Sequence, residues 1–532
     1  MSVAEGDVHP FAQFWRDETL RDWLERHVRQ SPQHVAVLGP GVSWTYADLH
    51  ARALALAARL RSLGIGRGDI VAVQLPNCVE FVLTYLATGY AGAILQTLHM
   101  PYRGSEIEFL LKHSGAKAVV CMAQGKDFQP AEAILAMQAR LPQLKHVLAV
   151  GGHAPDGALA FDAKADGTTL DERPESSDDF VLLYTSGTVS APKGVPTPYR
   201  KFLANAQLSA RELEIDSSSI LLSAAPFTHL YGLFSTNLAL AAGATIALLP
   251  VFSPPALAEA IDTFRPTQLF TAPAHMTACL QAGLLNEERL RSLRFLQISG
   301  SACPPELAQT IQAMMPDGKV VQLWGMSEMQ AGAYHRPGDP LDVRMTTAGR
   351  ASPGTQMRVW LDDAPLPAGE EGELQVRGCS VFGGYLANDE ATSGAFTRDG
   401  WFRTGDLARM DAEGNIRITG RLKEVINRGG VKFNPADIEV LIDQHPSVLQ
   451  CAIAPLPDPV MGERACCFAV LRPGASLSLD DIRAWMTKHE IGKTKWPERL
   501  EIVVEMPLTP TRKIKKADLV KGLLDNPPVE PI

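Results

Sequence analysis

One glycine- and hydroxyl-rich segment carries residue types that can hold a chain of phosphates. It runs Tyr184-Thr-Ser-Gly-Thr-Val-Ser-Ala-Pro-Lys193-Gly194 and directly follows the apolar residues 180–184. Small side chains leave backbone N–H groups accessible to phosphate oxygens, and a lysine at the end supplies positive charge. The Walker A pattern G-x-x-x-x-G-K-[ST] is absent, so the usual P-loop NTPase interpretation fails. A polyphosphate site of another kind is indicated, although such a stretch taken alone is as often an ordinary loop.

This segment resembles the phosphate loop of the adenylate-forming superfamily, which comprises acyl-CoA synthetases, the adenylation domains of peptide synthetases and firefly luciferase. The family pattern is T-S-G-T-T-G-x-P-K-G, and the chain departs from it at Val189 and Ser190. Further family motifs recur in the same order along almost the whole chain. In the phosphate loop, the resemblance assigns ATP contacts to Thr185, Ser186, Gly187, Thr188 and Lys193.

A second segment, Trp324-Gly325-Met326-Ser327-Glu328, is similar to the family's aromatic-Gly-x-Thr-Glu motif. The resemblance implies that the indole stacks on adenine, that the serine hydroxyl bonds the α-phosphate, and that the glutamate holds Mg²⁺. A carboxylate is a suitable hard ligand for Mg²⁺ beside phosphates. Without the family, the tryptophan would most simply be a core residue and the glutamate a surface residue. Ser301 and Ala302 are further expected nucleotide contacts.

The remaining motifs place a ribose site, a hinge and a lysine. Trp401-Phe-Arg-Thr-Gly-Asp406 matches the segment whose aspartate is expected to bind both ribose hydroxyls, a natural task for a carboxylate. Gly420-Arg421-Leu-Lys423-Glu424 resembles the family hinge, with the arginine near the ribose and Lys423 as the pivot. Pro507-Leu-Thr-Pro-Thr-Arg-Lys513-Ile resembles P-x-T-x-x-G-K-I, which makes Lys513 the counterpart of the catalytic lysine, with arginine in place of the customary glycine.

The resemblance implies a reaction in two steps. A carboxylate and ATP give an acyl-adenylate and pyrophosphate, and a thiol, expected to be that of coenzyme A, then displaces AMP. Charge stabilisation at phosphorus, rather than a protein nucleophile, is what the first step requires. In the family a mobile C-terminal domain rotates between the steps, and its glycine-bearing segment admits the pantetheine arm. The matching positions are Arg428, Gly429 and Gly430.

The resemblance implies that the acid lies beside His229, which we also predict to be catalytic. The surrounding candidates are mostly apolar or small: Tyr231, Phe234, Ala272, His275, Gly325 and Met326. No lysine or arginine stands among them, which favours a compact hydrophobic or aryl acid over a dicarboxylate. Aryl-acid ligases that serve carrier proteins typically carry His-Asn where this chain has His229-Leu230, and this speaks against salicylate-type acids. A lone histidine could equally belong to the core.

The apolar patterns predict an α/β protein of two domains. Helices are expected from Tyr46 to Leu63 and from Val79 towards Ala91, alternating with short apolar strands up to about residue 323. Glycine-punctuated short strands follow, among them residues 383–386. We expect a large N-terminal domain of helix-covered sheets plus a β-rich subdomain over residues 1–420, and a small mobile α+β domain over residues 421–532. Loops at strand ends should converge on one crevice.

Bulk composition narrows the class further. The chain has 532 residues, 46% of them hydrophobic and 20% charged, which suits a folded protein of more than one domain. A net charge of −9 argues against a general nucleic-acid binder. Eight cysteines without C-x-x-C spacing suit a reduced, cytoplasmic setting. The sequence contains no uninterrupted apolar run of about 18 residues, so no membrane span is predicted.

Three alternatives stay open at this stage. The acyl group could pass to a carrier-protein thiol or to an amine instead of coenzyme A, since the motifs would look nearly the same. The chain could also be a nucleotide-binding protein without turnover, although the matching Lys513, Glu328 and Asp406 weigh against that. The identity of the acid and the oligomeric state, with a homodimer as one option, are not determined by these patterns.

Overall fold

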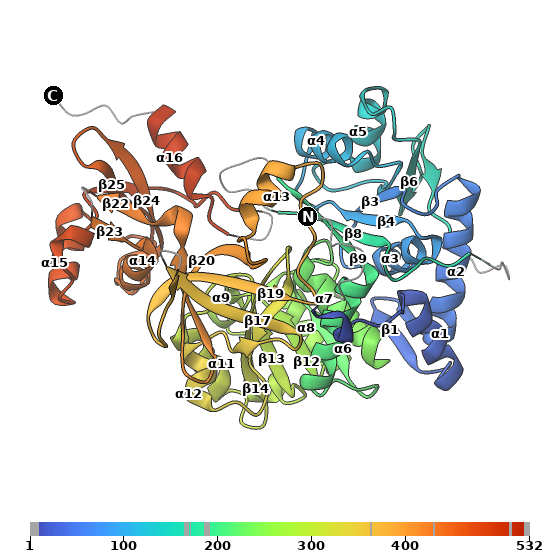
Figure 1. Ribbon diagram of the computed structural model, residues 1–532, viewed down its shortest axis with the longest axis horizontal. Helices are drawn as coiled ribbons and strands as arrows, with labels where there is room; N and C mark the ends of the chain where they lie inside the picture. The colour runs from blue at the N-terminus through green and yellow to red at the C-terminus, as the bar shows by residue number, and fades with distance from the viewer. Residues whose placement is uncertain are drawn as a thin grey trace. The chain divides into compact units, whose positions relative to one another are not determined.

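In the computed structural model of the chain, residues 10–163, 170, 172–185, 192–361, 364–428, 431–509 and 513–525 are described, with the backbone alone for residues 431 and 432. The chain divides into two compact units (Figure 1). The first comprises Met1–Thr185, Lys193–Gln356 and Arg377–Phe396, and the second contains Met357–Val376 and Thr397–Ile532. Each unit is described below by itself.

The first unit contains two large sheets. The nine-stranded sheet has the order β16 (Arg350–Ala351), β15 (Gln330–Tyr334), β14 (Lys319–Met326), β13 (Phe295–Ile298), β12 (Gln268–Thr271), β10 (Ile220–Ser223), β11 (Thr245–Ala247), β1 (Val35–Gly39) and β2 (Val42–Thr45). The seven-stranded sheet has the order β7 (Leu159–Ala160), β6 (His146–Val150), β5 (Ala118–Met122), β3 (Ile70–Gln74), β4 (Ile94–Thr97), β8 (Asp179–Tyr184) and β9 (Gly194–Pro198). Most neighbouring strands in both sheets are parallel, which suits strands joined by helices.

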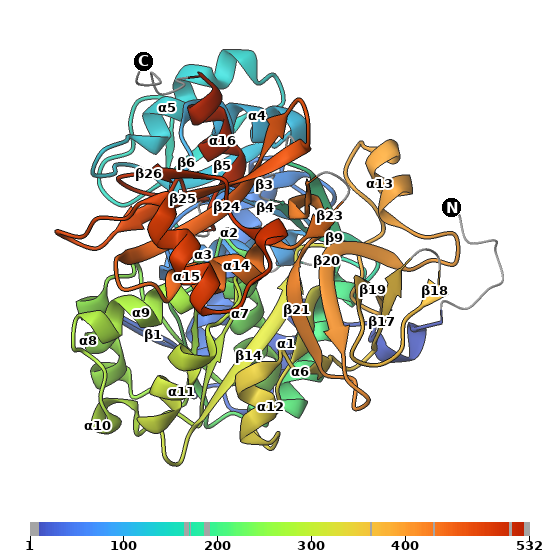
Figure 2. The same ribbon diagram turned by 90° about the vertical axis from the view of Figure 1, so that its left-hand side faces the viewer.

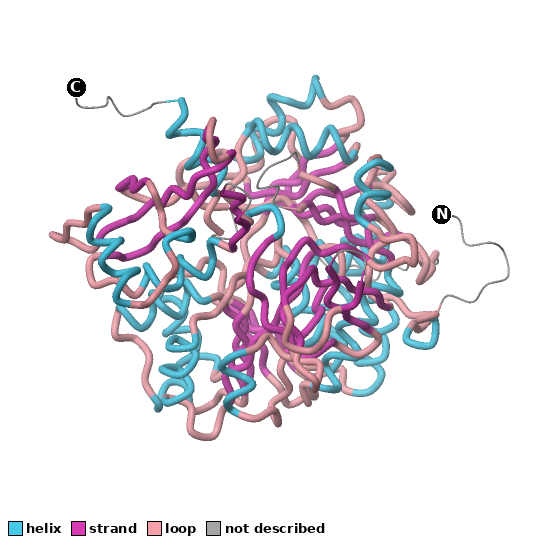
Figure 3. Tube along the Cα trace, turned by 60° about the vertical axis from the view of Figure 1, so that its left-hand side comes forward, coloured by secondary structure: helices cyan, strands magenta, loops and turns pink. Residues whose placement is uncertain are grey.

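Helices cover both faces of these sheets, as Figure 3 shows by colour. One apolar core joins both sheets and contains the side chains of α1 (Leu20–Gln30), α2 (Tyr46–Ser62), α3 (Val79–Ala91), α6 (Tyr199–Glu212) and α7 (Leu230–Ala242). A second core lies on the other face of the nine-stranded sheet, under α8 (Pro254–Phe264), α9 (Pro273–Gln281), α10 (Glu287–Leu290), α11 (Pro305–Ala313) and α12 (Leu341–Thr346). A third packs α4 (Gly104–Ser114) and α5 (Pro130–Met137) on the seven-stranded sheet. Because successive side chains of a strand point to opposite faces of its sheet, each strand contributes side chains to the cores on both faces.

The second unit is built on two smaller sheets (Figure 2). The first has the order β18 (Ala364–Pro365), β17 (Thr355–Leu361), β19 (Glu371–Gly378), β20 (Phe402–Met410) and β21 (Ile416–Arg421). The second has the order β23 (Val431–Phe433), β22 (Ile426–Arg428), β25 (Gly462–Leu471) and β24 (Val448–Asp458), with β26 (Arg499–Ile502) beside β25. Helices α14 (Pro435–Asp443) and α15 (Leu479–Lys488) cover one face of that sheet, and α16 (Lys516–Asp525) covers the other.

The predicted α/β class, with several helix-covered sheets and a smaller α+β part, is confirmed. The expected helix from Tyr46 ends at Ser62, followed by Gly64 at φ +75°, and the helix Val79–Ala91 matches its prediction. Strands β5, β6 and β12 are short apolar runs of the expected kind. The division at residues 420 and 421 stays a prediction. In the structure, β20 and β21 belong to the same compact unit as the segment that follows them.

Two local expectations are wrong. Residues 383–386 form a loop rather than a strand, because their backbone groups bond outside any ladder: Tyr385 N–H donates to the Thr392 hydroxyl at 2.9 Å and Leu386 N–H to the Gly194 carbonyl at 2.9 Å. The tryptophan-glycine segment was expected in a loop beyond a strand ending at Leu323. Strand β14 instead continues to Met326, because it turns back into an antiparallel hairpin with β15.

Candidate functional site

Thr185 and Lys193, the first and last predicted contacts of the phosphate loop, are hydrogen-bonded to each other. Thr185 follows β8 and Lys193 precedes β9, and these two strands pair antiparallel. Thr185 N–H donates to the Lys193 carbonyl at 3.0 Å, and Lys193 N–H donates to the Thr185 hydroxyl at 3.3 Å. The Lys193 backbone is therefore fixed beside Thr185, where the chain enters β9. The other three predicted contacts, Ser186, Gly187 and Thr188, lie outside the described residues.

Four loops that carry predicted site residues meet at one edge of the nine-stranded sheet. The parallel strands β10, β12, β13 and β14 are consecutive neighbours, so their carboxyl ends share that edge. His229 follows β10, Ala272 follows β12, and Ser301 and Ala302 follow β13. The hairpin bearing Glu328 leaves β14 at the same edge. The loops at His229, Ser301 and Glu328 were expected to converge on one crevice together with the phosphate loop. These three share the edge, whereas the common crevice and the roles of the individual side chains stay predictions.

The hairpin that carries Glu328 requires glycine at two positions. A Cβ on Gly325 would lie 2.1 Å from the Gln330 carbonyl oxygen, so only glycine permits this close turn. A Cβ on Gly332, in the facing strand, would lie 2.6 Å from the ring of Trp324, which therefore packs directly over that backbone. Glu328 itself is buried, with 7% of its surface exposed. The hairpin thus presents the predicted adenine and metal contacts from one rigid turn.

Residues Phe382–Leu386 connect this hairpin to the phosphate loop. Phe382 N–H donates to the Glu328 carbonyl at 2.7 Å, and Leu386 N–H donates to the Gly194 carbonyl at 2.9 Å. Between them, the Tyr385 hydroxyl donates to Glu328 Oε1 at 3.0 Å, and Lys193 Nζ lies 4.6 Å from the centre of the tyrosine ring. Burial and the neighbouring Glu328 carboxylate raise the pKa of Tyr385.

Tyr385 was missed in the sequence because its segment was interpreted as a short strand. The available signal was the pair of glycines before it, which favours a loop over a strand interior. As a result Lys193 and Glu328, which are 135 positions apart in the sequence, contact the same aromatic side chain. A cation and a carboxylate on one tyrosine form a suitable receptor for a metal-bound polyphosphate.

His229 caps the first turn of α7. Its Nδ1 accepts a hydrogen bond from Tyr231 N–H at 3.3 Å, which leaves Nε2 as the protonated nitrogen of the neutral ring. His99 lies behind it, with ring centres 6.1 Å apart, and Nδ1 of His99 lies 3.1 Å from the Thr228 hydroxyl. Burial lowers the pKa of His99 to about 4. The neighbour of the predicted catalytic His229 is therefore a buried, neutral histidine, His99.

The other predicted acid contacts are largely buried. Tyr231 and Phe234 of α7 expose 6% and 3% of their surfaces, and the Tyr231 hydroxyl donates to the Gln297 carbonyl at 2.9 Å. His275 Nδ1 accepts from Ala272 N–H at 3.3 Å, so this ring helps to begin α9. Met326 and Ser327, half-buried, lie at the end of β14 and just beyond it.

In the second unit the predicted ribose contacts are paired. Asp406 on β20 faces Arg421 on β21, and Arg421 Nε lies 2.6 Å from Asp406 Oδ1. The aspartate side chain is 4% exposed and the arginine side chain 47% exposed. The carboxylate is thus oriented from one side by a guanidinium. Lys423 is exposed in the short 3₁₀ turn Leu422–Glu424 that follows.

Lys513 is joined to Thr509 by two hydrogen bonds. Its N–H donates to the Thr509 hydroxyl at 3.0 Å, and Thr509 N–H donates to the Lys513 carbonyl at 2.7 Å. Arg428, predicted to contact coenzyme A, forms an ion pair with Glu498, with Nη2 and Oε1 2.6 Å apart. Gly429 and Gly430 lie outside the described residues.

The described residues contain no cluster of three or more His, Cys, Asp or Glu side chains able to hold a metal ion. One carboxylate suffices for Mg²⁺ that is bound mainly through substrate phosphates and water. Glu328, with one oxygen oriented by Tyr385, fits that requirement. No helix within the described ranges is long and apolar enough to cross a membrane.

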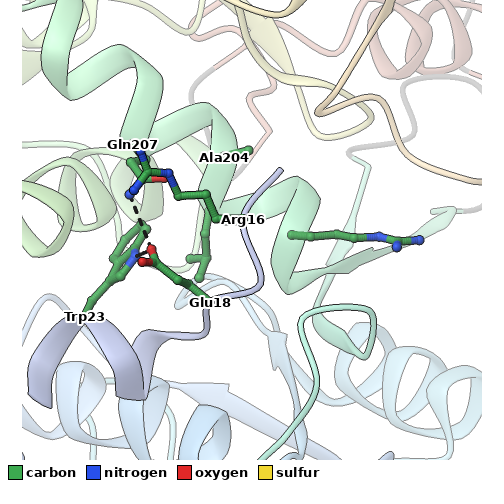
Figure 4. Close-up of a pocket in the computed structure, with 7 residues that line it drawn as sticks. Arg16, Glu18, Trp23, Ala204 and Gln207 are labelled. Atoms are coloured by element: carbon green, nitrogen blue, oxygen red, sulfur yellow. Dashed lines mark hydrogen bonds between the residues drawn. The ribbon is translucent and has the colours of Figure 1, made fainter. Parts of the chain in front are cut away.

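Figure 4 shows a separate pocket in the first unit, lined by none of the predicted site residues. The empty space between its lining residues is about 180 Å³ with open solvent included, well below the several hundred Å³ of typical ligand pockets. Its carboxylate, Glu18, accepts from Trp23 Nε1 at 3.0 Å and from Arg26 Nη2 at 2.7 Å. These bonds are those of a structural cluster rather than of a nucleotide site.

Two family models match the chain: the AMP-binding enzyme model over residues 24–386 and the model of the AMP-binding enzyme C-terminal domain over residues 437–513. A medium-chain fatty-acid–CoA ligase of Escherichia coli is 33% identical, over 96% of this chain and 91% of its own length. A salicylyl-CoA synthase / salicylate adenylyltransferase of a Streptomyces species is also 33% identical, over 98% and 97%. The crystal structure of the anthranilate CoA ligase AuaEII with anthranoyl-AMP has a TM-score of 0.85 at 25% identity, covering 95% of this chain and 97% of that one.

Proposed function

Because the chain belongs to the AMP-binding enzyme family of adenylate-forming ligases, we propose that it is an AMP-forming acid–CoA ligase. In the first step a carboxylate oxygen attacks the α-phosphorus of ATP, and pyrophosphate leaves. In the second the thiol sulfur of coenzyme A attacks the acyl carbonyl carbon, the thiol proton is lost, and AMP leaves. The names of the relatives, two CoA ligases and a salicylyl-CoA synthase, support this acceptor.

The observation that carries the proposal is the meeting of Lys193 and Glu328 around Tyr385. A positive charge at the neck of a glycine-rich loop suits the triphosphate, and the buried carboxylate suits its Mg²⁺. When bound, Mg²⁺ neutralises charge on the phosphate oxygens and stabilises the leaving pyrophosphate. We assign the ribose hydroxyls to Asp406 and charge stabilisation at the α-phosphorus to Lys513.

The acid we propose is a compact hydrophobic or aryl carboxylic acid bound near His229, Ala272 and Met326. Nδ1 of His229 accepts from the backbone, so the neutral ring carries its proton on Nε2, the nitrogen that we assign to an acid oxygen. Leu230 is buried at the first position of α7. An apolar side chain there supplies no amide for an ortho hydroxyl, which favours alkyl or unsubstituted aryl acids over salicylate.

Pyrophosphate release with a panel of acids tests the reaction and names the substrate. We expect release with one or more of the medium-chain, benzoate or cinnamate acids, dependent on ATP and Mg²⁺. Adding coenzyme A, a phosphopantetheinylated carrier protein or an amine in parallel identifies the acceptor by mass spectrometry. Product with the carrier protein or the amine alone would refute the CoA assignment. Absence of pyrophosphate with every acid would refute the enzyme assignment and favour a nucleotide-binding protein without turnover.

A further inference from the structure

We propose that Tyr385 is a positioning residue for adenylation, which orients the Glu328 carboxylate toward Mg²⁺ and separates it from the Lys193 ammonium. This inference rests on the proposed function of the same site. Its basis is the double contact of one side chain, through the hydroxyl to Glu328 Oε1 at 3.0 Å and through the ring face to Lys193 Nζ at 4.6 Å.

The chemical need for such a residue follows from the two charges. A lysine and a glutamate that serve one triphosphate are drawn to each other before the nucleotide arrives, and a direct ion pair would occupy both. A tyrosine satisfies each with a different part of its side chain. The ring face attracts the ammonium, and the hydroxyl donates a charge-assisted hydrogen bond to the carboxylate. Both groups stay charged and oriented without neutralising each other.

The tyrosine is itself held on both sides. Phe382 N–H donates to the Glu328 carbonyl at 2.7 Å, and Leu386 N–H donates to the Gly194 carbonyl at 2.9 Å. The ring also packs edge-on against Phe382, with centres 4.8 Å apart. Because the backbone is anchored to both loops that it serves, the position of the hydroxyl is tied to the position of the carboxylate.

The Tyr385 hydroxyl is engaged as a hydrogen-bond donor to Glu328 Oε1. Tyr385 is therefore assigned to orientation of charge, and proton transfer is left to other groups.

The test is a Mg²⁺ titration of Tyr385→Phe, which removes the hydroxyl and keeps the ring for Lys193. We expect the Mg²⁺ concentration for half-maximal pyrophosphate release to rise about tenfold, as for loss of an outer partner of a metal ligand, with KM for the acid unchanged. Tyr385→Leu should in addition raise KM for ATP, because the lysine loses its ring. A residue that only packs would change thermal stability and leave the Mg²⁺ dependence as it is.

Tyr46→Phe is the matched control, since it removes a buried tyrosine hydroxyl that donates to the Ala244 carbonyl at 2.8 Å, away from the predicted site residues. A Mg²⁺ dependence of Tyr385→Phe equal to that of the unsubstituted protein, or an equal shift in Tyr46→Phe, would overturn the inference. Calorimetric binding of α,β-methylene-ATP at several Mg²⁺ concentrations repeats the comparison without turnover. If no acid supports pyrophosphate release, the proposed function fails, and the calorimetric comparison still decides the role of Tyr385.

Discussion

The pairing of Asp406 with Arg421 permits a quantitative test of the ribose site. In Asp406→Asn the shape of the side chain is kept and its charge is lost. Because Arg421 is 47% exposed, water solvates the released guanidinium, and the free energy of unfolding should fall by less than about 1 kcal/mol. A hydrogen bond to a charged group contributes about 1.5–3 kcal/mol, roughly twice a neutral one. Replacing the charged acceptor by a neutral one should therefore lose about 1 kcal/mol for each of the two ribose hydroxyls. The free energy of nucleotide binding should fall by about 2 kcal/mol in all, or about thirtyfold in affinity.

The assay measures KM for ATP in pyrophosphate release with saturating acid. The melting temperature of each variant is measured in parallel. The chain offers a matched control in Asp458→Asn, because Asp458 pairs with Arg464 at 2.5 Å in the same unit, with side chains 10% and 49% exposed. We expect KM for ATP to rise in Asp406→Asn alone, with both variants melting near the original temperature. A KM for ATP within twofold of the unsubstituted value, or an equal rise in Asp458→Asn, would refute the ribose assignment.

Three further outcomes are expected. Lys513→Ala should abolish pyrophosphate release, whereas Lys423→Pro, at an exposed turn, should retain it and lose thioester formation; equal loss of both steps in the second variant would refute the hinge. Gly325→Ala should lower the free energy of unfolding by about 2 kcal/mol or more, because its Cβ meets a carbonyl oxygen, whereas Gly338→Ala, in open space, should be neutral in the same urea titration. Burial lowers the pKa of His335 from 6.5 to about 4. The unfolded chain therefore takes up this proton first as the pH falls, and stability should decline between pH 6.5 and 4 by up to about 1.4 kcal/mol per pH unit. Urea unfolding of His335→Gln should show a shallower decline, and an unchanged slope would contradict this.

Elements with a strong local signal could be predicted from the sequence. The helix Val79–Ala91 ends at Gly92, whose φ of +73° suits a helix C-terminus, and β5 is a short apolar run of the kind that a buried parallel strand requires. The convergence of loops was also predictable, since parallel strands joined by helices present their carboxyl ends at one edge. These features depend on neighbours in the sequence or on a general rule of topology.

The contacts around Tyr385 depend on neither. The two glycines before it favour a loop over a strand, but they do not specify which conformation that loop adopts. What determines its conformation is bonding to Gly194 and to Glu328, which are distant in the sequence and adjacent only after both sheets have formed. Lys193 and Glu328 were both predicted as site residues, yet the aromatic ring that both contact could not be inferred from spacing.

The ion pair between Asp406 and Arg421 could not be predicted from local sequence either. The glycine-containing turn between β20 and β21 predicts a hairpin, and in its first part Met410 faces Ile416 and Ala408 faces Ile418. Continued without interruption, that register would place Asp406 opposite Gly420. A bulge between Leu407 and Ala408 shifts the pairing by one residue and brings Asp406 opposite Arg421 instead. Because side chains alternate between the faces of a sheet, this single residue decides whether the carboxylate meets the guanidinium. The hairpin thus follows from local sequence, whereas the ion pair that orients the predicted ribose contact follows from an irregularity that local sequence does not specify.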